Sequence, residues 1–153
     1  MSFKILLPLC LLLPALPFQA PASAEREAVM ATVRKLFDGM RAGDGTAVRS
    51  VFHPQAQLAT ALAGDGKGTV QIDALEKFVA AVSSPHDEVW DERISNEVAH
   101  IDGTLAVVWA DYAFYTGQRF SHCGVDAFQL VKVGGAWQIV SIADTRRKEG
   151  CGA

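Results

Sequence analysis

The sequence predicts an α+β fold, with helices in the first part of the chain and an antiparallel sheet in the second. Apolar residues recur every three or four positions over residues 25–42, and four β-type segments separated by turn signals fill residues 88–146. Half of the 153 residues are hydrophobic and the formal net charge is −3. A folded domain is therefore expected, and no nucleic acid or anionic membrane is expected as a partner.

Residues 1–24 have the pattern of a secretory signal peptide. A cationic start at Lys4 precedes an apolar run, and small residues end at Ala24 before an acidic residue. Prolines interrupt the run, which argues against a stable membrane anchor. We expect cleavage near Ala24, a periplasmic or secreted protein, and a single domain over residues 25–153.

The remaining chain divides into elements with recognisable ends. The helix over residues 25–42 ends at Gly43, and a short helix from residue 44 or 45 to 52 ends where His53 precedes Pro54. We expect a strand over residues 57–62, a loop over 64–68 and a third helix from 72 or 73 to 82. The expected long strands span residues 88–101, 105–115, 122–133 and 137–146, with a Gly134-Gly135 turn joining the last two.

Three features of the sequence resemble the nuclear transport factor 2-like superfamily: this element order, the Phe52-His53-Pro54 corner and the closing segment from Gly135 to Ile139. The segment from His122 to Cys151 is similar to the branch named "putative lumazine-binding". The resemblance implies a cone-shaped curved sheet wrapped around a long N-terminal helix, also called cystatin-like, with a pocket at one end and usually a homodimer. It does not imply one activity, because the superfamily includes isomerases, dehydratases, epoxide hydrolases and binding domains.

Cys123 and Cys151 are the only cysteines after residue 24. A hairpin returns the end of its second strand to the start of its first, and an exported protein meets an oxidising compartment, so we expect a disulfide. Two separate small hydrophobic residues, or a free thiol, are the alternatives.

Side-chain alternation along the strands selects the candidate pocket residues. His122 and Asp126 share a face with Phe128, whose bulk indicates the interior. Applied to the neighbouring strands, the same reasoning predicts a pocket for a small apolar or aromatic molecule, lined by Trp109, Asp111, Tyr115, His122, Asp126 and Trp137, with Ser141 and Thr145 nearby.

Asp126, Asp111 and His122 are the candidate catalytic residues. A carboxyl group on an apolar wall has a raised pKa, which suits it to proton transfer. The alternative for Asp126 is a structural bond to Arg146, Tyr112 or the backbone. Asp144 and Arg146 share a face, so a local ion pair is expected there.

The sequence predicts no cofactor and no metal site, because its histidines and cysteines lack the spacing of metal ligands. Two functions remain: a small-molecule-binding domain without chemistry, and an isomerase- or dehydratase-like enzyme with Asp126 or Asp111 as base. A third possibility is a partner-binding module on the outer sheet face at Val125, Val131, Val140 and Ile142, although a homodimer accounts better for that surface.

Overall fold

A computed structural model describes residues 22–63 and 67–151 of the chain. Most of the expected signal peptide lies outside the described residues, and so does the centre of the expected loop at residues 64–68. Residues 22–24, the expected cleavage region, form the first turn of helix α1 (Ala22–Ala42).

Three helices precede or interrupt the first strands, close to the expected positions. Helix α1 buries Val29, Val33 and Leu36 along one stripe and is followed by Gly43 at φ +66°. Helix α2 (Gly45–Ser50) begins at Asp44, whose carboxylate accepts a 2.9 Å hydrogen bond from the Ala47 amide. Helix α3 (Leu75–Ser83) matches the expected third helix but starts two or three residues later.

In the described residues, six strands form one sheet in the order β2-β1-β6-β5-β4-β3. Neighbouring strands are antiparallel except β1 and β6, which are parallel. A direct hairpin fixes an antiparallel direction for its two strands, but β1 and β6 are joined by most of the chain and are free of that constraint. The strands are β1 (Phe52–Leu62), β2 (Thr69–Ala74), β3 (Trp90–Asp102), β4 (Leu105–Thr116), β5 (Arg119–Val133) and β6 (Ala136–Thr145).

The first two strands differ most from the expectation. β1 starts at Phe52 and therefore contains His53 and Pro54, with an irregular register before Gln57. The short edge strand β2 was not expected, since its last residues were assigned to the start of a helix and its first residues to no element. Pairing with β1 holds residues 69–74 extended, and an isolated sequence segment gives no signal for that pairing.

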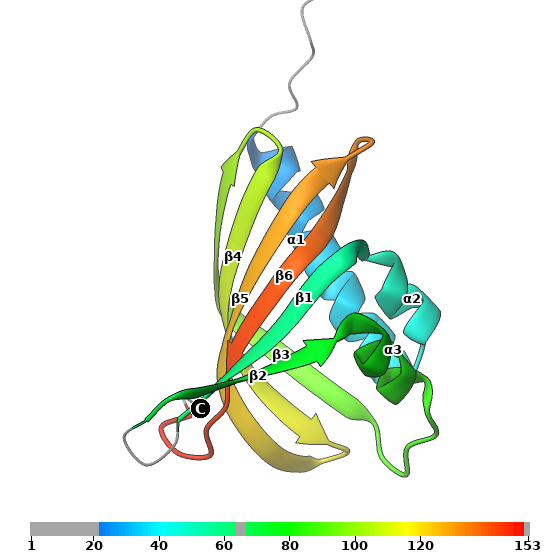
Figure 1. Cartoon of the computed structure of the whole chain (residues 1–153), viewed down its shortest axis with the longest axis vertical. Helices are drawn as coiled ribbons and strands as arrows, with labels where there is room; N and C mark the ends of the chain where they lie inside the picture. The colour runs from blue at the N-terminus through cyan, green and yellow to red at the C-terminus, as the bar shows by residue number, and fades with distance from the viewer. Residues whose placement is uncertain (1–21, 64–66, 152–153) are drawn as a thin grey trace, which may run out of the picture.

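The sheet curves around α1, and α2 and α3 lie together beside it (Figure 1). The core fills the space between α1 and the inner face of the sheet, where Phe128, Leu130 and Ile139 are at most 1% exposed. The predicted α+β class and its long helix inside a curved sheet are therefore confirmed. No helix in residues 22–63 and 67–151 is both long enough and apolar enough to cross a membrane.

The hairpin of β5 and β6 carries a disulfide near its open end. Gly134 and Gly135 turn the chain with φ of +59° and +86°, a conformation that glycine adopts without steric cost. At the other end a disulfide joins Cys123 to Cys151, with 5.8 Å between the Cα atoms, in agreement with the expected pairing.

Candidate functional site

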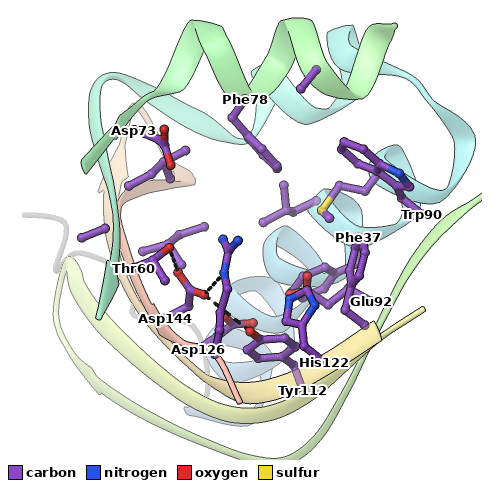
Figure 2. A pocket seen from close by; sticks show the side chains of 18 of the residues that line it. Phe37, Thr60, Asp73, Phe78, Trp90, Glu92, Tyr112, His122, Asp126 and Asp144 are labelled. Atoms are coloured by element: carbon purple, nitrogen blue, oxygen red, sulfur yellow. Dashed lines mark hydrogen bonds and ion pairs between the residues drawn. The ribbon is translucent and has the colours of Figure 1, made fainter. Parts of the chain in front are cut away.

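A cavity of about 520 Å³ lies between the helices and the inner face of the sheet. Helix α1 and helix α3 line one side of it, and all six strands contribute to the other. Figure 2 shows Phe78 and Trp90 on one side, facing Thr60, Asp126 and Asp144 across the open space. The cavity therefore has an apolar side and a polar side.

The apolar side is largely aromatic. Phe37 packs edge-to-face on Phe128 with 6.1 Å between ring centroids, and Trp90 packs in the same way on Phe114 at 6.2 Å. Phe78 extends from α3 toward the open space (Figure 2). Such walls bury the body of an apolar or aromatic molecule and leave its polar groups to the other side.

Two carboxyl groups, from Glu92 on β3 and Asp126 on β5, meet on the polar side and are hydrogen-bonded to each other. Burial raises the pKa of Asp126 to about 7, although the bond to Glu92 lowers it. Burial, with the charge of Asp126, also raises the pKa of Glu92. A hydrogen bond between two carboxyl groups needs a proton on one of them, and the raised pKa of Glu92 favours Glu92 as the group that holds it.

Asp126 has one further feature that points to the cavity. Its residue is only 4% exposed, and within the described part of the chain Oδ2 receives no hydrogen bond from an amide, hydroxyl or basic group. Buried polar atoms almost always have partners, because an unmade bond costs about 1–3 kcal/mol. The proton of the Glu92 pair, or a polar group of a bound molecule, is the remaining source of a hydrogen bond.

Asp144 on β6 is the centre of a second hydrogen-bonded cluster beside the Glu92–Asp126 pair. Its carboxylate accepts hydrogen bonds from Thr60 Oγ1 at 2.6 Å and from Arg146 Nε at 2.9 Å, and Tyr112 Oη lies 3.5 Å away (Figure 2). The expected ion pair of Asp144 and Arg146 is thus present, and both of its residues line the cavity.

The hydroxyl group of Tyr112 donates its hydrogen bond to the backbone. Its Oη donates to the carbonyl oxygen of Thr145 at 2.8 Å, so the hydroxyl is an acceptor, not a donor, toward the cavity. The same carbonyl lies so close to Gly124 that a Cβ atom there would be 1.8 Å from the oxygen. Gly124 is therefore required for β5 and β6 to approach at this point.

His122 lies at the cavity wall, with its ring 5.0 Å from the Phe114 ring and 5.7 Å from the Tyr112 ring between centroids. Its Nδ1 lies 3.0 Å from Ser121 Oγ. Burial, together with the charge of Arg146, lowers the pKa of His122. The imidazole is therefore neutral near pH 7 and offers one nitrogen as donor and the other as acceptor.

The structure brings two of the six predicted pocket residues together: His122 and Asp126 both line the cavity. Trp109, Asp111 and Tyr115 do not line it, so their placement in the pocket is corrected here. On β4 the inner face carries Ala106, Val108, Ala110, Tyr112 and Phe114, and Trp109 on the outer face is 56% exposed.

The reversed face of β4 has a physical reason. Large residues were taken to point inward, but the register pairs Val108 with Phe128 and Ala110 with Asp126, and directly opposed residues on neighbouring strands share a face. Asp111 instead accepts a hydrogen bond from Asn96 Nδ2 at 2.9 Å. Tyr115 lies under the guanidinium of Arg93, 4.3 Å from its centroid.

Trp137 faces inward as expected, but into the core and not into the cavity. Its Nε1 donates to Glu25 Oε2 at 3.1 Å, and Lys132 Nζ donates to the other oxygen of Glu25 at 2.6 Å. Trp137 therefore fixes the start of α1 against β5 and β6.

A bulge in β6 changes which residues face the cavity beyond Ile139. Leu130 pairs with Ile139 while Gln129 pairs with Ser141, so β6 has one extra residue, Val140. Ile142, Asp144 and Arg146 consequently face inward, and Ser141 and Thr145 do not line the cavity. Ile142 was assigned to the outer face, and this is also corrected.

Sequence reasoning missed several residues on the polar side of the cavity. Glu92 and Thr60 gave no local signal, because the strands that carry them come together only through the sheet. Tyr112 could have been found from the alternation of Ala106, Val108 and Ala110, had small residues been taken as the inner face. In the described ranges, no three His, Cys, Asp or Glu side chains are grouped in a way that could hold a metal ion.

Comparison with known families identifies the chain. The family model described as "Putative lumazine-binding" matches residues 24–143. The chain belongs to this family. The match covers α2, α3 and β1 to β5 completely, and most of α1 and β6, but the cavity residues Asp144 and Arg146 lie beyond its end. No match was found among curated proteins.

Solved structures with the same fold share little sequence with this family member. An NTF2-like protein of unknown function from Shewanella baltica OS155 superposes with a TM-score of 0.65 at 20% identity, covering 86% of this chain and 100% of that one. An NTF2-like protein with a cystatin-like fold from Novosphingobium aromaticivorans gives 0.67 at 9% identity, covering 84% of each chain.

A third protein, named "Putative Scytalone Dehydratase", from Novosphingobium aromaticivorans, gives a TM-score of 0.65 at 15% identity and covers 82% of this chain and 85% of that one. At such identities the likeness establishes the fold alone. The NTF2-like, cystatin-like architecture expected from the sequence is confirmed.

Proposed function

We propose that this protein binds a small, largely apolar or aromatic molecule in the cavity, with a polar group of that molecule at the Glu92–Asp126 pair. The observation that carries the proposal is the buried Oδ2 of Asp126, which accepts no hydrogen bond from an amide, hydroxyl or basic group of the described residues and lies at the wall of an aromatic cavity of about 520 Å³. A carbonyl or hydroxyl group would complete the hydrogen bonding of the pair, and the aromatic wall would bury the rest.

The test begins with native mass spectrometry of the protein purified from its own host, followed by identification of any retained molecule. Its affinity is then measured for wild type and for Asp126→Asn, with Asp111→Asn as the matched control on the outer side of the neighbouring strand. Weaker binding in Asp126→Asn alone is expected. Equal affinity in both variants would contradict the proposal.

A second variant tests the cavity itself. Ala81 on α3 lines the open space, so Ala81→Phe adds a ring where a bound molecule would lie. Loss of the retained molecule with an unchanged melting temperature is expected. Retention at full occupancy would place the binding site elsewhere.

The second candidate function is proton transfer, as in an isomerase- or dehydratase-like enzyme. The pKa of Asp126, near 7, favours this role, because a general acid or base works best when its pKa is close to the working pH. Asp126 would remove or donate a proton, and Glu92 would hold the shared proton. Neutral His122 could donate a hydrogen bond to an oxygen that gains charge. Asp111 no longer qualifies as a base, because it lies outside the cavity.

Substrate turnover separates the two functions. If a molecule retained by the wild type is released unchanged after long incubation, and no panel of ketones or hydroxylated rings is converted, the protein is a binding protein. Conversion that follows an apparent pKa near 7 and is lost in Asp126→Asn would support the enzyme.

We also propose that the protein is exported after cleavage near Ala24 and forms a homodimer. Support for export comes from the sequence of residues 1–24 and from the disulfide of Cys123 and Cys151, which suits an oxidising compartment. Support for the dimer comes from an apolar patch on the outer sheet face, made of side chains 38–56% exposed. This outer patch consists of Val98, Leu105, Val107 and Trp109.

A further inference from the structure

The residues just after β6 reach the cavity and are hydrogen-bonded to β5. After the Asp126–Asp144 pair, the same register continues to Cys123 and Arg147, which exchange two backbone hydrogen bonds of 2.9 Å. Arg146 comes two residues after Asp144, so alternation places both side chains on the inner face, where both line the cavity. The last regular residue of β6 is Thr145, so Arg146 already lies beyond the strand end.

The Cys123–Cys151 disulfide closes this segment back onto β5. Cys123 is at once the backbone partner of Arg147 and the covalent partner of Cys151. Residues 146–150 are exposed, and an isolated pair of backbone hydrogen bonds beyond the end of a strand would open readily without the covalent link. Thr145, the residue before Arg146, is also held in place, because its carbonyl accepts a hydrogen bond from the Tyr112 hydroxyl.

We propose that the Cys123–Cys151 disulfide is a positioning element of the cavity, which keeps the end of β6 on β5 and thereby holds Arg146 beside the Glu92–Asp126 pair. The inference rests on the proposed function only for its biological meaning. Reduction of the disulfide releases Arg146 and leaves the remainder of the cavity in place, because the other lining residues belong to helices and paired strands.

Release of Arg146 removes a cation without removing the anion next to it. Asp144 stays, because it lies in the β5–β6 ladder and accepts the 2.6 Å hydrogen bond from Thr60. The charge of Arg146 lowers the pKa of Asp126, and the charge of Asp144 raises it. Reduction therefore removes the effect of Arg146 while Asp144 and Glu92 stay in place, and the pKa of Asp126 rises.

The other ionisable groups that face the cavity do not move with this segment. Helix α1 contributes only apolar side chains to the lining, and the groups on the remaining elements are Asp73 on β2, Lys77 on α3, Glu92 on β3, Tyr112 on β4 and His122 on β5. The pKa of Asp126 in the reduced protein thus reports on Arg146. A chain kept in a reducing compartment would hold Asp126 protonated to higher pH, and export with oxidation would complete the site.

The experiment follows the ¹³C resonance of the Asp126 carboxyl through a pH titration, with Asp126→Asn used to assign it. The oxidised protein, the protein reduced with a phosphine, and Cys123→Ala/Cys151→Ala are compared. Arg146→Gln removes the cation directly, and Arg147→Gln, one residue away on the opposite face of the strand and absent from the cavity lining, is the matched control.

The expected result is a higher apparent pKa of Asp126 after reduction, in the cysteine variant and in Arg146→Gln, with no change in Arg147→Gln. Reducing the disulfide in the Arg146→Gln variant should not raise the pKa of Asp126 further, because the cation that the disulfide positions is already gone. An unchanged pKa after reduction overturns the proposal. A fall toward about 4, the value of an exposed aspartate, also overturns it, since that signals general unfolding. No ligand enters this titration, so its failure and a failure to find a ligand are separate results.

Discussion

Glu92 on β3 and Asp126 on β5 bring two carboxyl groups together in the cavity, although β4 lies between their strands. Asp126 is buried and Glu92 is half-buried at the wall of the same cavity, and loss of water favours the neutral form of each carboxyl group. Two ionised carboxylates would repel each other there, whereas one shared proton converts the repulsion into a hydrogen bond. This pair links the stability of the fold to the chemistry of its cavity.

The pair makes stability depend on pH. The pKa of Asp126 is about 7 in the folded protein and near 3.8 when it is exposed, so the unfolded state loses its proton first as pH rises. Stability contributed by the protonated carboxyl is complete below about pH 4 and is lost as pH rises toward 7. We expect Asp126→Asn to flatten this part of the stability curve, which urea unfolding between pH 4 and 8 measures.

The size of the effect is about 1.4 kcal/mol for each unit of pKa shift. Asp111→Asn provides the control, because Asp111 is outside the cavity. A pH dependence that is equally steep in wild type and in Asp126→Asn would show that Asp126 does not carry the buried proton.

Gly124 is predicted to tolerate no larger side chain. A Cβ at this position would lie 1.8 Å from the Thr145 carbonyl oxygen and 2.7 Å from Tyr112 Cε1, so Gly124→Ala must separate β5 from β6. We expect a loss of about 2 kcal/mol or more in the free energy of unfolding. Gly103→Ala is the control: Gly103 has φ +57° and no atom within 4 Å of a Cβ, and should cost only about 1 kcal/mol. Equal losses would refute the close approach.

Trp109 is predicted to act in assembly and not in the cavity. It is 56% exposed on the outer sheet face, opposite Val98 on β3. If the outer patch forms the dimer, Trp109→Glu places a charge in an apolar interface and yields a monomer, whose mass light scattering after size exclusion measures. Binding by the cavity should be unaffected. A wild type that is monomeric at high concentration would remove the dimer proposal.

Trp137 is predicted to stabilise the fold without contacting a ligand. Its ring is 6% exposed and its Nε1 bonds Glu25, so Trp137→Phe leaves a gap and removes a hydrogen bond that anchors α1. A loss of roughly 1–3 kcal/mol in thermal or urea unfolding is expected, with no change in ligand affinity. If affinity falls while stability is kept, Trp137 belongs to the binding site after all.

The elements of the second half of the chain could be predicted closely because their signals are local. Alternating residues between Leu105 and Val133 and the glycine pair at 134 and 135 place β4, β5 and the hairpin within a few residues. β2 could not be found in this way, because residues 69–74 are extended only through pairing with β1. The polar side of the cavity was hardest, because one extra residue at Val140 reverses the faces of β6 beyond it.

The amino-acid sequence by itself determined the α+β class, the family, the hairpin and the cysteine pair, since each depends on periodicity, on turn residues or on a contiguous segment. It also placed His122 and Asp126 on the inner side of β5, because the bulk of Phe128 identifies that side. Only the tertiary structure decided that Glu92 meets Asp126, that Asp144 and Arg146 face the cavity, and that Trp109 faces outward. Those outcomes depend on the register between neighbouring strands and on the extra residue in β6, and no local pattern encodes either of them.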